Sequence, residues 1–230
     1  MILAIDSSTM NGSLALGKEG KLVCEINFQV PGSYSSILMP LIDELLKAYQ
    51  VRLTDLKALA VALGPGSFTA LRIGLATIKG LAYSSGTPVV GIPSLDSLAW
   101  NLWGQAGLIC PLIDAKRGEV YSANYRFDND KQEMTRLSCY QVLAPEKLAE
   151  QTAEEMFFTG DGLARCGSLL ADLLGERARF APQSDWLPRG RNLLALAWAR
   201  VNTGDFDELS DLAPLYVRRS QAEVDKVQCQ

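Results

Sequence analysis

The stretch MILAID at positions 1–6 sets the plan of the chain, because it is an apolar run ending on an aspartate and it recurs as LICPLID at 108–114. Short apolar runs of this kind are typical of buried strands. Each run is followed by a glycine and a second strand-like run. Later in each half come a strand, a Gly-x-Gly turn (GPG at 64–66, GDG at 160–162) and a helix. The repeat predicts two related lobes with a cleft between them, a common place for a ligand.

The composition excludes several kinds of chemistry. The chain has 230 residues, of which 48% are hydrophobic, and a net charge of −4, which argues against a protein that coats nucleic acid by itself. It contains no histidine, so a Ser-His or Cys-His nucleophile and an imidazole base are excluded. A zinc site would need scattered cysteines and carboxylates, and we therefore predict no metal site.

The cysteines and the apolar runs indicate a cytoplasmic protein. No two cysteines form a Cys-x-x-Cys pair and their number is odd, so we expect reduced thiols. They are Cys24, Cys110, Cys139, Cys166 and Cys229. The chain starts directly with a strand pattern, and no uninterrupted apolar stretch of about 18 residues follows. We expect neither a signal peptide nor a membrane span.

The apolar pattern predicts alternating strands and helices. In the first lobe we expect strands at 2–5, 12–16, 22–28, 56–63 and 88–91, and helices at 34–49, 69–83 and 94–103. In the second lobe we expect strands at 108–113, 119–127, 134–140 and 156–159, and helices at 145–150, 163–174 and 191–201. Ser33 and Ser94 are the expected N-caps. The first three strands are expected to form an antiparallel meander. The pattern does not indicate where helix 191–201 packs in the fold. The tail is expected to be loose beyond Ser220.

The helix at 34–49 carries two adjacent apolar stripes, more than one core-facing side requires. Its apolar residues are Ile37, Leu38, Leu41, Ile42, Leu45, Leu46 and Tyr49. Two interpretations stay open. The helix is enclosed within its own lobe, or one stripe faces the sheet and the other faces a partner protein.

Two segments have the composition of anion-binding turns. In GPGSFTALRIG (64–74) a strand enters a glycine turn and then a helix N-terminus, where backbone N–H groups and the helix dipole favour an anion. It is not a Walker loop, because no Gly-Lys-Ser/Thr follows. A tight turn whose glycines serve geometry alone is the simpler interpretation. The hydroxyls and carboxylate of DSST (6–9) suit a phosphate or metal–phosphate contact, or an ordinary turn.

Taken in order, five strings of the sequence resemble the TsaB (YeaZ) family, and they span residue 2 to about residue 220. They are ILAIDSST, ALGPGSFTALRIG, PVVGIPSLDSLA, LIDAKRGEVYSANY and PLYVRRS. The resemblance implies an actin-like, Hsp70-like (ASKHA) duplicated two-lobed α/β fold. It implies a partner-docking lobe at 1–104 and a second lobe at 105–230, whose last helix and tail return toward the first. It also implies a non-catalytic subunit that works with a TsaD-like catalytic paralogue and a TsaE-like ATPase. Together they place a threonylcarbamoyl group on the adenosine beside the tRNA anticodon, and this chain meets tRNA only through that assembly.

The resemblance also indicates what this chain lacks. The catalytic paralogue has GVNHLEGH, whose two histidines hold a metal, where this chain has GIPSLDSL (91–98) with Ser94 and Leu98 in their places. A leucine cannot ligate a metal. In DAKRGE (114–119), long charged side chains replace the glycines that let a phosphate approach the backbone. Lys116 and Arg117 are interpreted as solvated hairpin charges rather than anion contacts.

We therefore expect at most weak binding of ATP or ADP and no tightly bound cofactor. The candidate nucleotide-binding residues are Asp6, Ser7, Ser8, Gly64, Gly66 and Ser67.

The resemblance places the docking surface on the helices at 34–49 and 69–83, where Gly74, Ala76 and Gly80 keep the second helix thin. The candidate interface residues are Ile37, Leu38, Leu41, Leu45, Leu71, Leu75 and Ile78. We expect a homodimer in isolation that exchanges for a heterodimer with the paralogue. The alternative is that these faces close on their own lobe.

Two other functions stay open. One is an ATP-dependent carbamoyl or phosphoryl transferase that uses its own cleft and is sensitive to Asp6→Ala or Ser67→Ala. The other is a peptidase, which without histidine would need a Ser-Lys scheme, and no Ser-x-x-Lys motif stands out.

Overall fold

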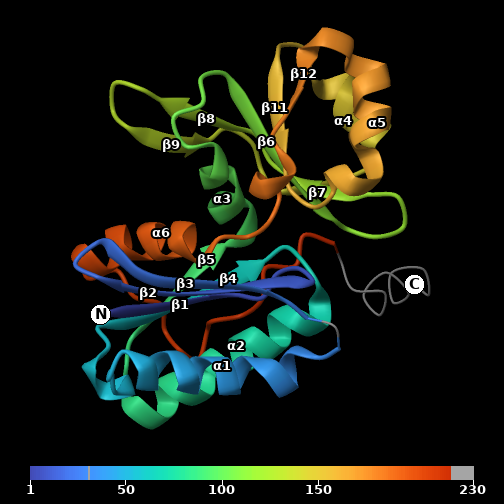
Figure 1. Cartoon of the computed structure of the whole chain (residues 1–230). Coiled ribbons are helices and arrows are strands. Elements are labelled where there is room, and N and C mark those ends of the chain that lie inside the picture. Colours follow the sequence, from blue (N-terminus) through green and yellow to red (C-terminus); the bar gives the residue numbers. More distant parts are fainter. Residues whose placement is uncertain (31, 219–230) are drawn as a thin grey trace, which may run out of the picture.

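The first lobe is built on a five-stranded sheet with the strand order β3-β2-β1-β4-β5 (Figure 1). The computed structural model describes residues 1–30 and 32–218. The strands of this sheet are β1 (Ile2–Asp6), β2 (Asn11–Lys18), β3 (Lys21–Gln29), β4 (Ala58–Gly64) and β5 (Val89–Pro93). Strands β1 to β3 form the predicted antiparallel meander, and β4 then pairs with β1 in parallel.

Helices cover both faces of this sheet. Helices α1 (Tyr34–Ala48) and α2 (Phe68–Ser85) lie side by side on one face, and α6 (Gly190–Asn202) with α3 (Ser94–Ala99) covers the other (Figure 1). Strand β1 is buried on both sides, since Leu3 and Ile5 join the core beneath α1 and α2 whereas Ile2 and Ala4 join the core beneath α6. The predicted cap of α1 is confirmed, because the Ser33 hydroxyl accepts a hydrogen bond from the Ser35 N–H.

The second lobe repeats this plan on a seven-stranded sheet. Its strands are β6 (Leu108–Asp114), β7 (Val120–Ser122), β8 (Tyr125–Asp128), β9 (Glu133–Arg136), β10 (Gln141–Leu143), β11 (Met156–Thr159) and β12 (Ala178–Phe180). Helices α4 (Pro145–Gln151) and α5 (Leu163–Leu174) lie beside β11 and β12 (Figure 1). Strand β6 pairs antiparallel with β7 and parallel with β11, as β1 does with β2 and β4. The repeat seen in the sequence is therefore a repeat of the fold.

Two strand predictions in the second lobe were wrong. The single strand expected at 119–127 is divided into β7 and β8, which pair with opposite ends of β6. The break falls where the Asn124 N–H donates to the Ser138 hydroxyl at 2.9 Å instead of to a neighbouring strand. The strand expected at 134–140 ends early, because β9 stops at Arg136 and β10 begins only at Gln141. Strand β12, which is only three residues long, was not predicted.

Helix α6 follows the second lobe in the chain but packs on the first. A Cβ atom on Gly17 would lie 2.3 Å from Leu194 Cδ2, so β2 carries a glycine where α6 presses against it. At the start of the helix, the Gly190 N–H donates to the buried Ser13 hydroxyl at 2.7 Å. The apolar pattern predicted this helix but not its position, whereas its return toward the first lobe agrees with what the family resemblance implied.

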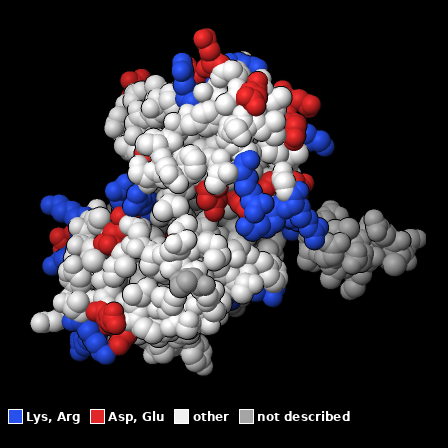
Figure 2. All heavy atoms as spheres, turned by 45° about the vertical axis from the view of Figure 1, so that its right-hand side comes forward, with Lys and Arg blue, Asp and Glu red and all other residues white. Residues whose placement is uncertain are grey.

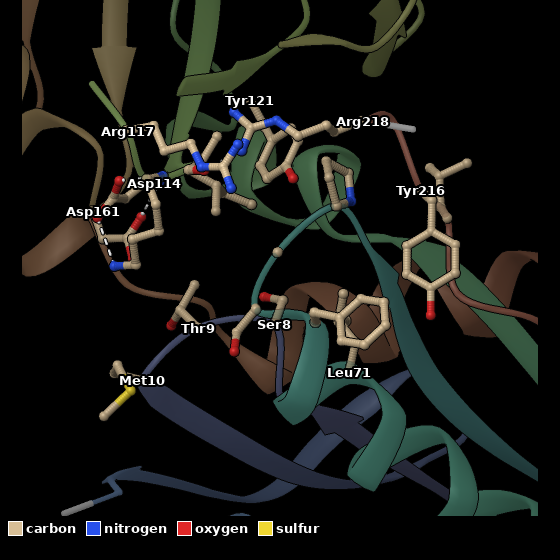
Figure 3. A pocket seen from close by; sticks show the side chains of 18 residues that line it. Ser8, Thr9, Met10, Leu71, Asp114, Arg117, Tyr121, Asp161, Tyr216 and Arg218 are labelled. Carbon is tan, nitrogen blue, oxygen red and sulfur yellow. Dashed lines mark hydrogen bonds and ion pairs between the residues drawn. The ribbon is translucent and has the colours of Figure 1, made fainter. Parts of the chain in front are cut away.

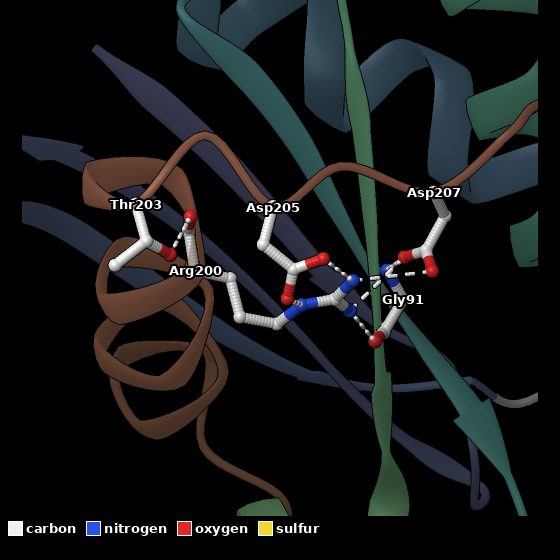
Figure 4. Close-up of polar contacts among 5 residues, drawn as sticks. All are labelled: Gly91, Arg200, Thr203, Asp205 and Asp207. Atoms are coloured by element: carbon white, nitrogen blue, oxygen red, sulfur yellow. Dashed lines mark hydrogen bonds and ion pairs between the residues drawn. The ribbon is translucent and has the colours of Figure 1, made fainter.

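The segment after α6 covers the outer edge of β5. The Asp207 N–H donates to Val89 O at 2.9 Å, and the Gly91 N–H donates to Asp207 Oδ2 at 2.7 Å. Arg200 reaches the same edge, donating to Gly91 O and to the carboxylates of Asp205 and Asp207 (Figure 4). An edge strand has backbone N–H and C=O groups without partners in the sheet, and these contacts provide such partners for β5.

The four cysteines among the described residues are free thiols, and Cys229 and the tail beyond Ser220 lie outside the described residues. No helix in the ranges 1–30 and 32–218 is long and apolar enough to cross a membrane.

Candidate functional site at the interlobe cleft

A cavity of about 470 Å³ lies between the lobes, which is a volume typical of small-molecule sites. Four segments line it: the turn after β1, the GPG turn with the start of α2, the hairpin after β6 with Asp161, and the segment Leu215 to Arg218. Figure 3 shows these side chains converging from both lobes. The predicted cleft is therefore present.

Hydrogen bonds within the turn after β1 fix its conformation, and a further hydrogen bond ties the turn to α2. Asp6 is 1% exposed, and its Oδ1 accepts the Ser8 N–H at 2.9 Å and the Ser8 hydroxyl at 2.6 Å. Burial raises the pKa of Asp6, although these hydrogen bonds act in the opposite direction. The buried Ser7 hydroxyl donates to Ala70 O at 3.0 Å on α2. Asp6 and Ser7 thus serve the packing of the turn and do not line the cavity.

The glycines of the GPG segment serve close packing. A Cβ atom on Gly66 would lie 2.2 Å from Ser8 O, which accepts the Ser67 N–H at 2.7 Å. A Cβ atom on Gly74 would lie 2.1 Å from the Ser7 hydroxyl oxygen. This geometry favours the interpretation of a tight turn over that of an anion cradle.

Among the six candidate nucleotide-binding residues, three line the cavity and three lie behind it. Ser8, Gly66 and Ser67 line it, whereas Asp6, Ser7 and Gly64 do not. The structure brings the candidate segments together, but it presents only half of the chosen residues to a ligand.

The hairpin after β6 has an unusual backbone. Lys116 (φ 62°) and Arg117 (φ 56°) both adopt the left-handed conformation, which costs a residue with a side chain about 1–2 kcal/mol. Asp114 holds the tip, since its carboxylate accepts the Lys116 N–H at 2.8 Å and the Lys116 ammonium at 2.7 Å. It also pairs with Arg165 at 3.1 Å.

The two carboxylates beside this hairpin differ in acidity. Burial alone would raise the pKa of Asp114, but hydrogen bonds from Lys116 and the charges of Lys116 and Arg165 hold that pKa below its usual range. Burial raises the pKa of Asp161, whose Oδ1 accepts the Asp114 N–H at 3.1 Å. Asp161 therefore supports the backbone of β6 where it enters the hairpin.

The segment Leu215 to Arg218, which we call the strap, joins the lobes across the cleft. Its Leu215 N–H donates to Leu63 O at 2.7 Å, and Tyr216 stacks on Phe68 with ring centroids 5.3 Å apart. Arg218 crosses to the second lobe, donating to Ala115 O at 3.1 Å and pairing with Glu119. The string PLYVRRS contains the strap, but as a sequence it indicated only the family resemblance.

Ser94 and Leu98 have structural roles. Ser94 begins α3 as its first helical residue, so the expected cap is wrong. Its hydroxyl instead accepts the Gly64 N–H at 3.0 Å. Leu98 is 2% exposed and packs in the core between the lobes. Among the described residues, no group of three His, Cys, Asp or Glu side chains is placed to hold a metal ion.

The burial of the candidate interface residues requires a correction. Leu38, Leu45 and the α2 residues Leu71, Leu75 and Ile78 are all buried within the first lobe. They cannot form a docking surface, because four of them belong to the core beneath α1 and α2 and Leu71 lines the interlobe cavity. Ile37 and Leu41 are half-buried against the same cores.

The outer face of α1 and α2 is formed by other residues. Met39 is 45% exposed and Tyr83 is 86% exposed. On α2, Ala76 and Gly80 are also exposed, and a Cβ atom on Gly80 would meet no atom within 4 Å. Gly74 faces inward toward Ser7. Sequence reasoning selected the larger apolar side chains, and these are the ones that the lobe itself requires.

The chain has relatives that align over nearly its whole length. The TsaB protein of Escherichia coli is 36% identical over 96% of both chains, and the TsaB protein of Bacillus subtilis is 31% identical over 100% of this chain and 99% of its own. The solved structure of YeaZ from Pseudomonas aeruginosa superposes with a TM-score of 0.80 at 30% identity, covering 94% of this chain and 98% of that one. The family TsaD, tRNA N6-adenosine threonylcarbamoyltransferase, matches residues 30–226.

The two lobes share the same arrangement of strands and enclose a cleft between them. This architecture defines a protein of the actin-like ATPase fold, as predicted. The PilM–PilN type IV pilus biogenesis complex shares this fold with a TM-score of 0.50 at 12% identity. Within the fold, the sequence relatives narrow the assignment. The chain belongs to the TsaB family of tRNA threonylcarbamoyladenosine biosynthesis proteins.

Proposed function

We propose that this chain is a non-catalytic assembly subunit for N6-threonylcarbamoylation of the adenosine beside the tRNA anticodon. It works with a TsaD-like catalytic paralogue and a TsaE-like ATPase, in the cytoplasm. The family assignment supports the pathway. The role within the pathway rests on the residues of this chain.

One observation carries the non-catalytic role. Where the family's catalytic paralogue is expected to place two metal-binding histidines, this chain has Ser94 and Leu98. The Ser94 hydroxyl bonds the Gly64 N–H, and Leu98 lies in the core. Ser94 therefore holds α3 to β4 within the first lobe and Leu98 fills the core between the lobes, so a reactive centre there would disrupt packing that the fold uses.

We also propose that the outer face of α1 and α2 is the docking surface, formed by Met39, Ala76, Gly80 and Tyr83. Small residues let the backbone of a partner helix approach closely, and an exposed tyrosine supplies contact area. The chain forms a homodimer through this face when alone and exchanges it for the paralogue. Because the larger apolar residues are buried, other side chains are proposed as the contact residues, but the proposed docking surface stays on α1 and α2.

Binding of ATP or ADP in the cleft is proposed to be weak. Ser8, Gly66 and Ser67 line the cavity, but Asp6 is closed off by Ser8 and the hairpin tip places long side chains near the opening. The buried Asp6 also speaks against a transferase that uses this carboxylate in its own cleft.

Reconstitution tests the proposal. The purified chain, a TsaD-like protein and a TsaE-like ATPase are combined with tRNA and a threonylcarbamoyl donor, and the modified nucleoside is measured after digestion. We expect no product from the chain alone and product only when all three proteins are present. Turnover by the chain alone at the rate of the full set would overturn the proposal.

A further inference from the structure

We propose that the cleft rim, formed by Phe68, Arg72, Lys116, Arg117, Tyr216 and Arg218, binds RNA directly. Its cations contact backbone phosphates and its aromatic pair stacks on an unpaired base. The identity of the natural RNA as a tRNA rests on the proposed function, whereas the binding chemistry rests on the rim itself.

Charge is distributed unevenly in the molecule. The chain holds 26 acidic and 22 basic residues, but three cations and two carboxylates line the cavity. The cations are Lys116, Arg117 and Arg218, the carboxylates are Asp114 and Asp161, and Arg72 adds a cation beside Tyr216. Figure 2 shows Lys and Arg side chains gathered at the boundary between the lobes. A local excess of positive charge on an acidic protein points to an anionic ligand.

The hairpin tip presents its cations outward. The Ala115 N–H donates to Glu119 O and the Glu119 N–H donates to Lys116 O, both at 3.0 Å, so the tip is a closed turn. The Lys116 side chain is 69% exposed although it pairs with Asp114. Figure 3 shows Arg117 and Arg218 extending from opposite sides above Tyr121 at the mouth of the cavity.

The aromatic pair is suited to a base. Phe68 and Tyr216 are 49% and 48% exposed, and their rings stack with 29° between the planes. The Arg72 guanidinium lies 3.9 Å from the Phe68 centroid and donates to the Tyr216 hydroxyl at 2.9 Å, which fixes the pair. Aromatic rings beside arginine are the common platform for bases of single-stranded RNA.

The layout favours an extended polyanion over a single nucleotide. The rim spans the start of α2, the hairpin and the strap, and so it runs across both lobes instead of surrounding one point. The rim also continues onto α2, whose outer face is the proposed docking surface, so a strand held here would extend toward the partner.

The test uses the full chain and a fluorescein-labelled anticodon stem-loop RNA, with anisotropy measured from low to moderate KCl. We expect affinity to fall as salt rises. The variant Lys116→Gln/Arg117→Gln should lower the slope of log affinity against log salt by about 1.4, because each contact to single-stranded RNA contributes about 0.7. Tyr216→Ala should weaken binding at least about fivefold, the lower end of the effect of one stacked base.

The matched control is Arg126→Gln/Arg179→Gln, which changes net charge equally in the same lobe at two exposed arginines paired with Glu154 and Glu155. It should bind as the wild type does, and thermal unfolding checks that all variants fold. The proposal is overturned if the hairpin variant matches this control, if wild-type binding is independent of salt, or if millimolar ATP displaces the RNA completely. Because no partner or donor is present, this result is independent of the reconstitution.

Discussion

The contact between Gly74 and Ser7 sets the position of α2 against the cleft and gives a quantitative prediction. In Gly74→Ala the new Cβ would lie 2.1 Å from the Ser7 hydroxyl oxygen and 3.1 Å from its Cβ. Overpacking of this kind costs about 1–3 kcal/mol, whereas alanine gains about 1 kcal/mol over glycine within a helix. We expect Gly74→Ala to lower the free energy of unfolding by about 1 kcal/mol.

The second substitution, Ser7→Ala, removes the oxygen that causes the clash. Alone it loses the hydrogen bond to Ala70 O, which is worth about 1 kcal/mol. Combined with Gly74→Ala it makes room for the new methyl group, so the helix gain is recovered. The double variant should be about as stable as the wild type, a coupling of about 2 kcal/mol.

Urea denaturation followed by circular dichroism measures all four members of this cycle. Gly167→Ala in α5 is the control, because its Cβ would meet only Leu163 at an ordinary distance of 3.9 Å, and it should stabilise the protein by up to about 1 kcal/mol. The reasoning fails if Gly74→Ala behaves like Gly167→Ala, or if the Ser7 and Gly74 substitutions add within about 0.5 kcal/mol.

Three further outcomes are expected. Asp6→Asn should stabilise the fold at neutral pH, because the pKa of Asp6 is raised in the folded state and the stability of the wild type falls as pH rises through that pKa. The gain should vanish below the ordinary pKa of aspartate. Urea titrations at several pH values measure it, and a gain that is constant with pH would contradict this. Arg200→Ala should cost about 2 kcal/mol in thermal unfolding, since it strips the partly buried Asp207 and the β5 edge of their partner, and a change within about 0.5 kcal/mol would refute that role. Tyr83→Asp should shift the isolated chain from dimer to monomer in sedimentation velocity, whereas Leu137→Asp, equally polar but on the second lobe, should not; a monomeric wild type would disprove the docking surface.

Much of the fold could be predicted from the sequence because local signals agreed with the tertiary plan. The runs at β1 and β6 are buried on both faces and therefore continuous, and the Ser33 cap and the turn around Gly20 are set by residues close in sequence. Boundaries in the second lobe were less predictable. Strands β7 and β8 form one apolar pattern, and only pairing with opposite ends of β6 divides them.

The candidate site was predicted by segment but not by side chain. The β1 turn and the GPG turn were both chosen as nucleotide-binding segments, and the structure brings them together because they follow the neighbouring parallel strands β1 and β4. Sequence patterns could not show that Asp6 is turned away from the cavity, because that depends on its hydrogen bonds to Ser8. Nor could they show Tyr216 and Arg218 at the cleft, since Arg72 and Ala115, which they contact, lie 144 and 103 residues away along the chain.

The placement of α6 has a consequence for biosynthesis. The face of the first sheet formed by Ile2, Ala4 and Ala60 is closed by Leu193, Leu194 and Ala197, which emerge from the ribosome only after the entire second lobe. We therefore expect the nascent N-terminal half to carry an uncovered apolar surface until α6 is made. A fragment ending at residue 104 should aggregate, whereas a circular permutant that begins with α6 should fold its first lobe as soon as that lobe is made.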